Sequence, residues 1–227
     1  MMTEFRYRGI ASAMPFFTWG DVMRRAQAES LALLGFSAHE SAYRVVASRS
    51  GWRLRCYGGA DGGGPLLIVA APIKRPYIWD LMPSASAVRY CLARGFRVYL
   101  LEWCPPHPAV RPEGLGFYGD LAIGACVTHV RAREGAPPLL LGHSLGGTLA
   151  GIFACLHPKH IRGLVLLGAP LSFGPGSSAF RESLVALYPL PAPDHGWIPG
   201  SALSQLSALA SPESFIWPRM TDALLAW

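Results

Sequence analysis

Residues 138–147, PLLLGHSLGG, place Ser144 between Gly142 and Gly146, after an apolar run and before a helical stretch. This arrangement is typical of a nucleophile elbow, a tight strand-to-helix turn that exposes a catalytic hydroxyl. Glycines are needed on both sides because side chains there would collide with the neighbouring strand and helix. The alternative is a chance Gly-Ser turn, but the flanking elements favour the elbow. We therefore predict that Ser144 is the catalytic nucleophile.

A nucleophile of this kind needs hydrogen-bond donors for the oxyanion that forms on the substrate. The helix that begins at Leu145 offers the free N–H of Leu145 itself. The second donor should come from residues 71–75, APIKR, which follow the first apolar run. Pro72 has no N–H, so Ile73 is the predicted donor. A plain strand exit at these residues is the alternative.

A serine also needs a base, which an acid normally orients. Beyond Ser144 the candidate histidines are His157, His160 and His195. The first two fall between a helix and the next strand, on the edge of the sheet opposite the elbow. His195 follows Asp194 in an irregular segment, and His143 is expected to be a packed or partly exposed neighbour of the serine. The position of His195 is left open by the sequence, so the catalytic Asp and His are not evident in this chain.

Four short apolar runs alternate with helical stretches and indicate the elements that position these residues. Runs that are apolar on both faces are typical of a parallel sheet covered on both sides, so we predict an α/β fold. The runs are 66–71, 97–103, 139–141 and 163–167, and the helical stretches are 84–94, 118–134 and 145–156. Extended segments at 43–48 and 52–57 come first. In the second, Arg53 and Arg55 alternate with apolar residues, which predicts a strand with one face covered.

The flanking regions differ from this core. Helical spacing over 21–36 predicts an N-terminal helical segment within residues 1–40, and residues 41–170 form the predicted core. Residues 171–227 contain short apolar clusters between Pro, Gly and Ser, with no clear fifth strand, and we interpret them as a cap or lid. The core therefore looks incomplete, truncated in or after the cap.

Composition narrows the functional classes. The net charge of +6 is spread along the chain with no block of like charges, which argues against a nucleic-acid-binding arm. Five widely spaced cysteines without a CxxC pair predict reduced core thiols, and with no signal-peptide pattern they indicate a cytoplasmic protein. No apolar stretch approaches the about 18 residues of a membrane span. No metal or cofactor is expected.

Four further candidates have competing interpretations. Asp80 and Arg75 could line a site for an acyl carrier, but a salt bridge or a helix cap fits them at least as well. Glu102 could act as an acid only if a histidine reached it, and Cys104 is interpreted as a structural thiol. The tryptophans could face an acyl tunnel, but core packing is favoured; they are Trp79, Trp103, Trp197 and Trp217.

Three segments together resemble the polyhydroxyalkanoate synthases, above all those that work with a partner subunit. The likeness covers about residues 40–220, and its R-P-Y-x-x-D-L block is more specific than GxSxG. The segments are LLIVAAPIKRPYIWDLMPSASAVRYCLARGFRVYLLEW, FACLHPKHIRGLVLLGAPLSF and WIPGSALSQLSALASPESF.

The resemblance implies an α/β-hydrolase fold and transfer of 3-hydroxyacyl groups from coenzyme A to a growing polyester. It makes Ser144 the acyl-accepting nucleophile, with Leu145 and Ile73 as oxyanion donors. It also implies a hydroxyacyl-CoA or polyester substrate, leaves room for a partner subunit or self-association, and allows a place at a polyester granule surface.

The chain departs from the family pattern in two ways. The synthases generally carry cysteine at the elbow, where this chain has Ser144, and their catalytic Asp and His lie on later units beyond the cap. The serine favours hydrolysis by an esterase, thioesterase or depolymerase, because a hydroxyl depends on a base more than a thiol does, and a synthase variant that tolerates serine is an alternative. A remnant or accessory subunit without activity is the other alternative.

Overall fold

The computed structural model describes residues 2–35, 37–59, 62–104, 114–187 and 200–217. Contacts divide the chain into two compact units. One unit is Ala38–Leu171, and the other combines Met1–Ser37 with Ser172–Trp227. The first and last segments of the chain therefore belong to the same unit.

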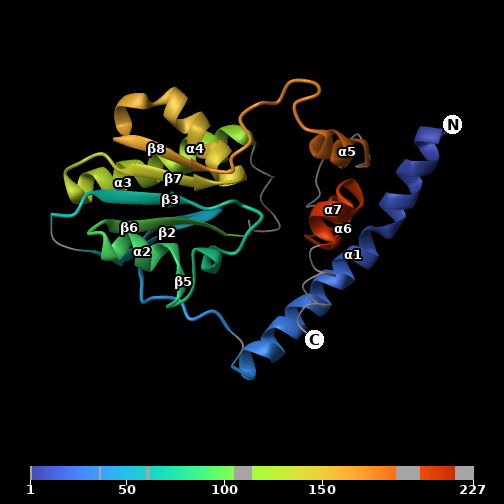
Figure 1. The fold of residues 1–227 in the computed structure, drawn as a ribbon, viewed down its shortest axis with the longest axis horizontal. Coiled ribbons are helices and arrows are strands. Elements are labelled where there is room, and N and C mark those ends of the chain that lie inside the picture. Colours follow the sequence, from blue (N-terminus) through green and yellow to red (C-terminus); the bar gives the residue numbers. More distant parts are fainter. Residues whose placement is uncertain (1, 36, 60–61, 105–113, 188–199, 218–227) are drawn as a thin grey trace. The chain divides into compact units, whose positions relative to one another are not determined.

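Within the described residues of the Ala38–Leu171 unit, six strands form one sheet in the order β1-β2-β6-β3-β7-β8 (Figure 1). The hairpin of β1 and β2 lies at one edge, and β2 pairs antiparallel with β6. From β6 to β8 all pairs are parallel. The strands are β1 (Arg44–Arg49), β2 (Trp52–Gly58), β3 (Pro65–Val69), β6 (Arg97–Trp103), β7 (Leu139–His143) and β8 (Gly163–Leu167).

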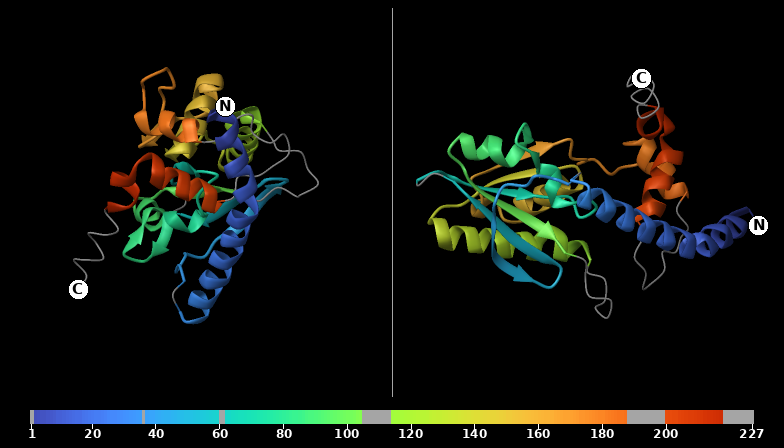
Figure 2. Two further views of the ribbon diagram at one scale, coloured as in Figure 1. Left: turned by 90° about the vertical axis from the view of Figure 1, so that its right-hand side faces the viewer. Right: turned by 90° about the horizontal axis from the view of Figure 1, so that it is seen from below.

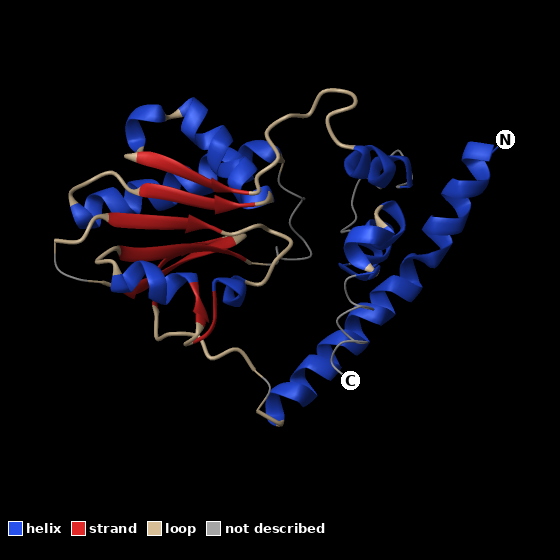
Figure 3. Cartoon of the chain, in the orientation of Figure 1, coloured by secondary structure: helices blue, strands red, loops and turns tan. Residues whose placement is uncertain are grey.

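Helices cover both faces of this sheet, which confirms the predicted α/β architecture (Figures 2 and 3). On one face α3 (Ala122–Glu134) and α4 (Leu145–Leu156) bury residues such as Ile123 and Phe153 against the strands. On the other face α2 (Ala87–Ala93) and the short helix η1 (Pro76–Trp79) contribute Val88 and Trp79. All five residues of β3 are buried because both of its faces are covered.

Two details differ from the sequence prediction. Strand β2 is predicted to have one covered face, but its second face is covered as well, since Arg55 on that face is only 3% exposed. Arg55 can be buried because Glu102 neutralises its charge. The helix predicted over 84–94 begins later, at Ala87. A small hairpin of β4 (Asp80–Met82) and β5 (Ala85–Ser86) precedes it, and the Ser86 hydroxyl caps it by accepting a hydrogen bond from the Arg89 N–H.

The segment before α3 has a conformation that the sequence did not reveal. Residues Phe117–Leu121 form a π-helical turn, η2, which leads directly into α3. As predicted, Gly135 stops helix α3, and the structure shows that it does so in the left-handed conformation. Turns of the η2 type often occur at functional sites.

The second unit is helical in its described parts. Helix α1 (Met2–Leu33) is longer than the predicted 21–36, and α5 (Ala179–Leu187), α6 (Gly200–Ala210) and α7 (Pro212–Phe215) follow residue 171 without a described strand. The Asp21 carboxylate of α1 accepts hydrogen bonds of 2.8 Å from the N–H groups of Gly200 and Ser201, which joins α1 to the start of α6. Among the described helices, none combines the length and the apolar character needed to cross a membrane.

Candidate active site

Ser144 lies on the turn between β7 and α4 in a strained backbone conformation. Its φ is 54° and its ψ is −130°. Among the residues that the structure describes, no other non-glycine residue has a positive φ. Its N–H donates a 3.0 Å hydrogen bond to the carbonyl of Leu167, the last residue of β8. Its carbonyl accepts from Gly147 and Thr148 at 2.9 and 3.1 Å. Hydrogen bonds to β8 and α4 therefore keep Ser144 in this unfavourable backbone conformation. Such conformations persist only where the surrounding structure fixes them, which is common at functional sites.

The glycines around Ser144 are needed because backbones meet there. A Cβ on Gly142 would lie 2.5 Å from the Cα of Gly147, and one on Gly146 would lie 2.3 Å from the carbonyl oxygen of Val69. Gly147 has the same role, since its Cβ would lie 2.6 Å from the side chain of Ala169. Sequence reasoning missed Gly147, although the Gly-Gly pair at the helix start was the available signal.

The N–H of Leu145 is the first of α4 and donates to no group in the described part of the chain. It lies at the positive end of the helix dipole, which favours a developing negative charge. A free N–H at the start of a helix is suited to an oxyanion donor, and the role of Leu145 remains a prediction.

Ile73 lies in a β-turn that follows β3. The turn is closed by a 3.0 Å hydrogen bond from the Lys74 N–H to the Ala71 carbonyl, with Pro72 and Ile73 as its central residues. Because Pro72 has no N–H, Ile73 carries the free amide of the turn, and its side chain is 56% exposed. In the parallel register Val69 is opposite Gly142, so this turn and the elbow leave the same edge of the sheet. The role of Ile73 as the second donor remains a prediction.

The described residues provide no base for Ser144. Its hydroxyl makes no hydrogen bond to a described histidine, and the exposed ring of His143 packs edge-on against Trp79 with centroids 6.3 Å apart. His157 follows the last residue of α4, a 12-residue helix that spans about 18 Å at 1.5 Å per residue. His195 and Asp194 lie outside the described residues.

His157 and His160 form a separate cluster at the far end of α4. The Nε2 of His157 lies 2.7 Å from Asp120 Oδ1 of η2, and the two histidine rings stack with centroids 5.4 Å apart. This cluster joins the C-terminal end of α4 to η2. It is a histidine–carboxylate pair, but it is one helix length away from the nucleophile.

The buried carboxylates near the sheet edge are engaged in ion pairs. Asp80 is fully buried and accepts hydrogen bonds from Ser86 Oγ at 2.6 Å and Arg89 Nε at 3.4 Å. Burial alone would raise the pKa of Asp80, but these bonds and those from Ser41 lower it below the ordinary value. Asp80 therefore has the ion-pair role considered for it, while Arg75 is exposed and precedes η1.

Glu102 is bound by two arginines of β2. Its carboxylate accepts from Arg53 at 2.5 and 2.7 Å and from Arg55 Nε at 2.5 Å. Arg55 also bonds Glu40 at 2.6 Å, and its guanidinium lies 4.1 Å from the ring centroid of Tyr43. No histidine is bonded to Glu102 within the described residues, so this carboxylate is not placed to serve as a catalytic acid.

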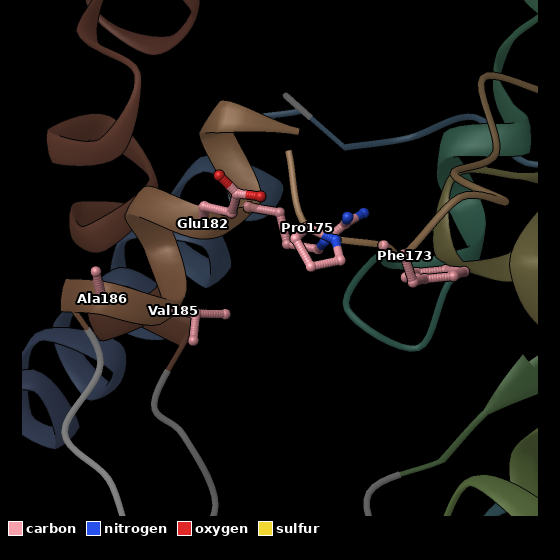
Figure 4. A pocket seen from close by; sticks show the side chains of 7 residues that line it. Phe173, Pro175, Glu182, Val185 and Ala186 are labelled. Atoms are coloured by element: carbon pink, nitrogen blue, oxygen red, sulfur yellow. The ribbon is translucent and has the colours of Figure 1, made fainter. Parts of the chain in front are cut away.

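The other unit contains a pocket of about 490 Å³ beside α5 (Figure 4). Phe173, Pro175, Arg181, Glu182 and Val185 line it, and the guanidinium of Arg181 lies 5.0 Å from the Phe173 ring centroid. Arg181 also donates to the Ser172 carbonyl at 3.0 Å. The pocket is thus built from the segment that the sequence predicts to be a cap, a role that remains a prediction. The described residues contain no cluster of metal-ligating side chains.

Relatives of the chain are poly(3-hydroxyalkanoate) polymerases, which confirms the resemblance seen in its motifs. The polymerase subunit of Haloferax mediterranei is 43% identical over 110 residues, covering 48% of this chain and 22% of that protein. The subunit of Allochromatium vinosum is 37% identical over 110 residues, covering 48% and 31%. Polymerase 1 of Ectopseudomonas oleovorans is 31% identical over 167 residues, covering 67% and 29%.

The matches thus span less than a third of the length of these relatives. Among solved structures, a carboxylesterase of Bacillus subtilis aligns with a TM-score of 0.46 and 17% identity, covering 84% of this chain and 68% of that one. A model of the alpha/beta hydrolase fold family matches residues 79–192, half of the chain, and includes the elbow. The chain therefore belongs to the alpha/beta hydrolase fold family.

Proposed function

We propose that the chain is an acyl-transfer protein that accepts the acyl group of a hydroxyacyl thioester or ester on the Oγ of Ser144. The observation that carries the proposal is the strained elbow, which places Ser144 directly before the free Leu145 N–H at the start of α4. The names of the relatives support a hydroxyacyl substrate. Because the chain covers only part of those proteins, the activity of a whole polymerase belongs to the proposal.

The chemistry follows from these positions. Ser144 Oγ forms a bond to the substrate carbonyl carbon while a general base, which would come from outside the described residues, takes its proton, and the carbonyl electrons move to oxygen. The N–H groups of Leu145 and Ile73 would hold that oxyanion. Collapse breaks the C–S or C–O bond, and the leaving group takes the proton from the base. The acyl group then passes to a substrate hydroxyl in synthesis, or to water in hydrolysis.

Hydrolysis is the favoured second step for a serine at this position. A cysteine thiol, with a pKa of about 8.5, is partly ionised at neutral pH, whereas a serine hydroxyl needs a base during the step. An esterase, thioesterase or polyester depolymerase therefore fits Ser144 better than a synthase does, and a synthase variant that tolerates serine is the alternative. Location in the cytoplasm belongs to the proposal through the widely spaced cysteines. A place at a polyester granule, and a partner subunit or a second copy, belong to it through the resemblance alone.

A second candidate function is that of an accessory subunit without catalytic activity. The observation that favours it is the absence of a histidine hydrogen-bonded to Ser144 within the described residues. An elbow without a base could still bind an acyl group or a partner chain.

Turnover separates the two functions. The wild-type protein and a Ser144→Ala variant would be incubated with 3-hydroxybutyryl-CoA and with p-nitrophenyl butyrate, following release of thiol and of nitrophenol. We expect the wild type to release both products, and Ser144→Ala to be at least about 100-fold slower. Free hydroxybutyrate would identify hydrolysis, and linked hydroxybutyryl units would identify synthesis. Equal rates, or no release by either protein, would reject the catalytic proposal and favour the accessory subunit.

A further inference from the structure

The indole of Trp103 is hydrogen-bonded to Ala70, the residue between β3 and the turn from Ala71 to Lys74 that carries Ile73, which we call the oxyanion turn. Its Nε1–H donates to the carbonyl oxygen of Ala70 at 2.6 Å. We propose that Trp103 is a positioning residue, which fixes this carbonyl and thereby the direction in which the Ile73 N–H points. The inference rests on the proposed function, because the Ile73 N–H matters only if an oxyanion forms beside Ser144.

Ala70 occupies the junction between the two parts of the site. It follows β3 directly, and the turn from Ala71 to Lys74 that carries Ile73 begins one residue later. The first turn of α4 packs on the same point, since a Cβ on Gly146 would lie 2.7 Å from the carbonyl carbon of Ala70 and 2.9 Å from its oxygen. A small rotation of the Ala70 peptide would therefore move the turn relative to the elbow.

The carbonyl of Ala70 depends on Trp103 for its hydrogen bond. Ala70 is only 1% exposed, so water has little access to it, and a buried carbonyl without a donor is unfavourable. The donor belongs to a neighbouring strand: Trp103 is the last residue of β6, and β6 pairs with β3. The indole thus holds the end of β3 beyond the last residue of the regular sheet.

Aromatic contacts hold the indole itself in place. The ring of Tyr118 packs against Trp103 with centroids 5.1 Å apart, and Phe117 packs edge-on against Tyr118 at 5.2 Å. Both belong to η2, in which Gly119 also approaches the Ile152 side chain of α4. The π-helical turn therefore contacts the elbow helix on one side and, through Trp103, the oxyanion turn on the other.

This arrangement should affect the rate more than the binding of substrate. The oxyanion exists only at and near the transition state, so a donor that is out of place weakens transition-state stabilisation and leaves ground-state binding nearly unchanged. For Trp103→Phe, which keeps an aromatic ring and removes the N–H, we expect kcat to fall about 10- to 100-fold, with KM changed by less than about threefold.

Trp52 provides a matched control. It is opposite Trp103 in the β2–β6 register and is 4% exposed, and its indole makes no hydrogen bond within the described residues. Trp52→Phe removes the same atoms from the same sheet without releasing the Ala70 carbonyl, so its kcat should stay within about threefold of the wild type. Ester hydrolysis by both variants would be measured with p-nitrophenyl butyrate, and their folding by urea unfolding.

A second substitution at Trp103 distinguishes an effect on folding from loss of the hydrogen bond to Ala70. Replacing Trp103 by its benzothiophene analogue keeps the bicyclic shape and its contact with Tyr118 and removes only the donor. If the analogue and Trp103→Phe lower kcat while Trp52→Phe does not, the proposal is supported. It is overturned if the analogue retains wild-type kcat, or if KM rises while kcat is unchanged. If the wild type is no faster than Ser144→Ala, the proposed function itself fails and this inference fails with it.

Discussion

The N–H of Ser144 donates a 3.0 Å hydrogen bond to the carbonyl of Leu167, so the end of strand β8 holds the nucleophile elbow from the side. The bond joins the residue that follows β7 to the last residue of β8, and these two strands are parallel neighbours in the same sheet. It helps to keep Ser144 at a φ of 54° that a residue with a side chain rarely adopts.

Relief of that strain should be measurable. Glycine adopts the conformation of Ser144 without the cost that a Cβ imposes, whereas alanine retains the cost. We expect Ser144→Gly to have a free energy of unfolding about 1 kcal/mol higher than Ser144→Ala, although neither variant carries the hydroxyl. Urea unfolding of the two variants gives the comparison. An alanine variant as stable as the glycine variant would mean that the elbow is not strained.

The contact between α4 and β3 should not tolerate a methyl group at Gly146. Its Cβ would lie 2.3 Å from the Val69 oxygen, which is backbone and cannot move aside, so we expect Gly146→Ala to lower the free energy of unfolding by about 3 kcal/mol. In the same helix a Cβ on Gly151 would lie an ordinary 3.4 Å from Leu171. Gly151→Ala should therefore be neutral, or stabilising by up to about 1 kcal/mol. A similar decrease in the free energy of unfolding for both variants, measured by urea unfolding, would contradict the close approach of Gly146 to the Val69 carbonyl.

The ion pairs of Glu102 should make stability depend on pH. Burial alone would raise the pKa of Glu102, but hydrogen bonds from Arg53 and Arg55 outweigh it and hold the pKa below the ordinary value. The folded protein therefore binds this proton less tightly than the unfolded chain does. The resulting stabilisation is complete above the pKa of the unfolded chain and is lost as the pH falls through the lower pKa of the folded protein.

Glu102→Gln should remove this contribution. At pH 7 we expect the free energy of unfolding to fall by about 3 kcal/mol, because Arg55 is left buried with Glu40 as its remaining carboxylate partner. The difference between variant and wild type should shrink as the pH falls below about 4.5. Urea unfolding from pH 3 to 7 would test this. A difference that stays constant over this range would exclude Glu102 as its source.

A cysteine at the elbow tests the electrostatics of the α4 N-terminus without requiring a base. The N-terminus of a helix lowers the pKa of a thiol placed there, which increases the reactive thiolate at neutral pH. In Ser144→Cys, we expect iodoacetamide to alkylate the new thiol on the order of tenfold faster than Cys155. Cys155 is an exposed cysteine in the last turn of the same helix, and mass spectrometry distinguishes the two sites. Equal rates would argue against activation by α4.

The sheet and the elbow could be predicted because their signals are local. Strands such as β3 are short runs that are apolar on both faces, and Gly142 and Gly146 mark the points where backbones meet around Ser144. These features depend on residue types that are close in the chain. The same reasoning explains why Leu145 and Ile73 could be named: the first N–H of a helix and the free amide of a Pro-containing turn follow from position alone.

The interactions between distant residues could not be predicted in this way. Arg55 reads as the exposed residue of a strand, yet it is buried against Glu102, 47 positions away. The pairing of Asp120 with His157 depends on η2, whose π-helical form has no clear sequence signal. The bond from Trp103 to Ala70 likewise requires knowing that β6 lies beside β3.

Covalent labelling of Ser144 tests the central claim most directly. The protein would be treated with a fluorophosphonate probe, and the modified residue would be located by mass spectrometry, with Ser144→Ala and the urea-unfolded wild type as controls. An unactivated serine does not react efficiently with such a probe. We predict an adduct on Ser144 in the folded wild type and none in either control. A folded wild type without an adduct, or with an adduct that persists in Ser144→Ala, would contradict Ser144 as the nucleophile.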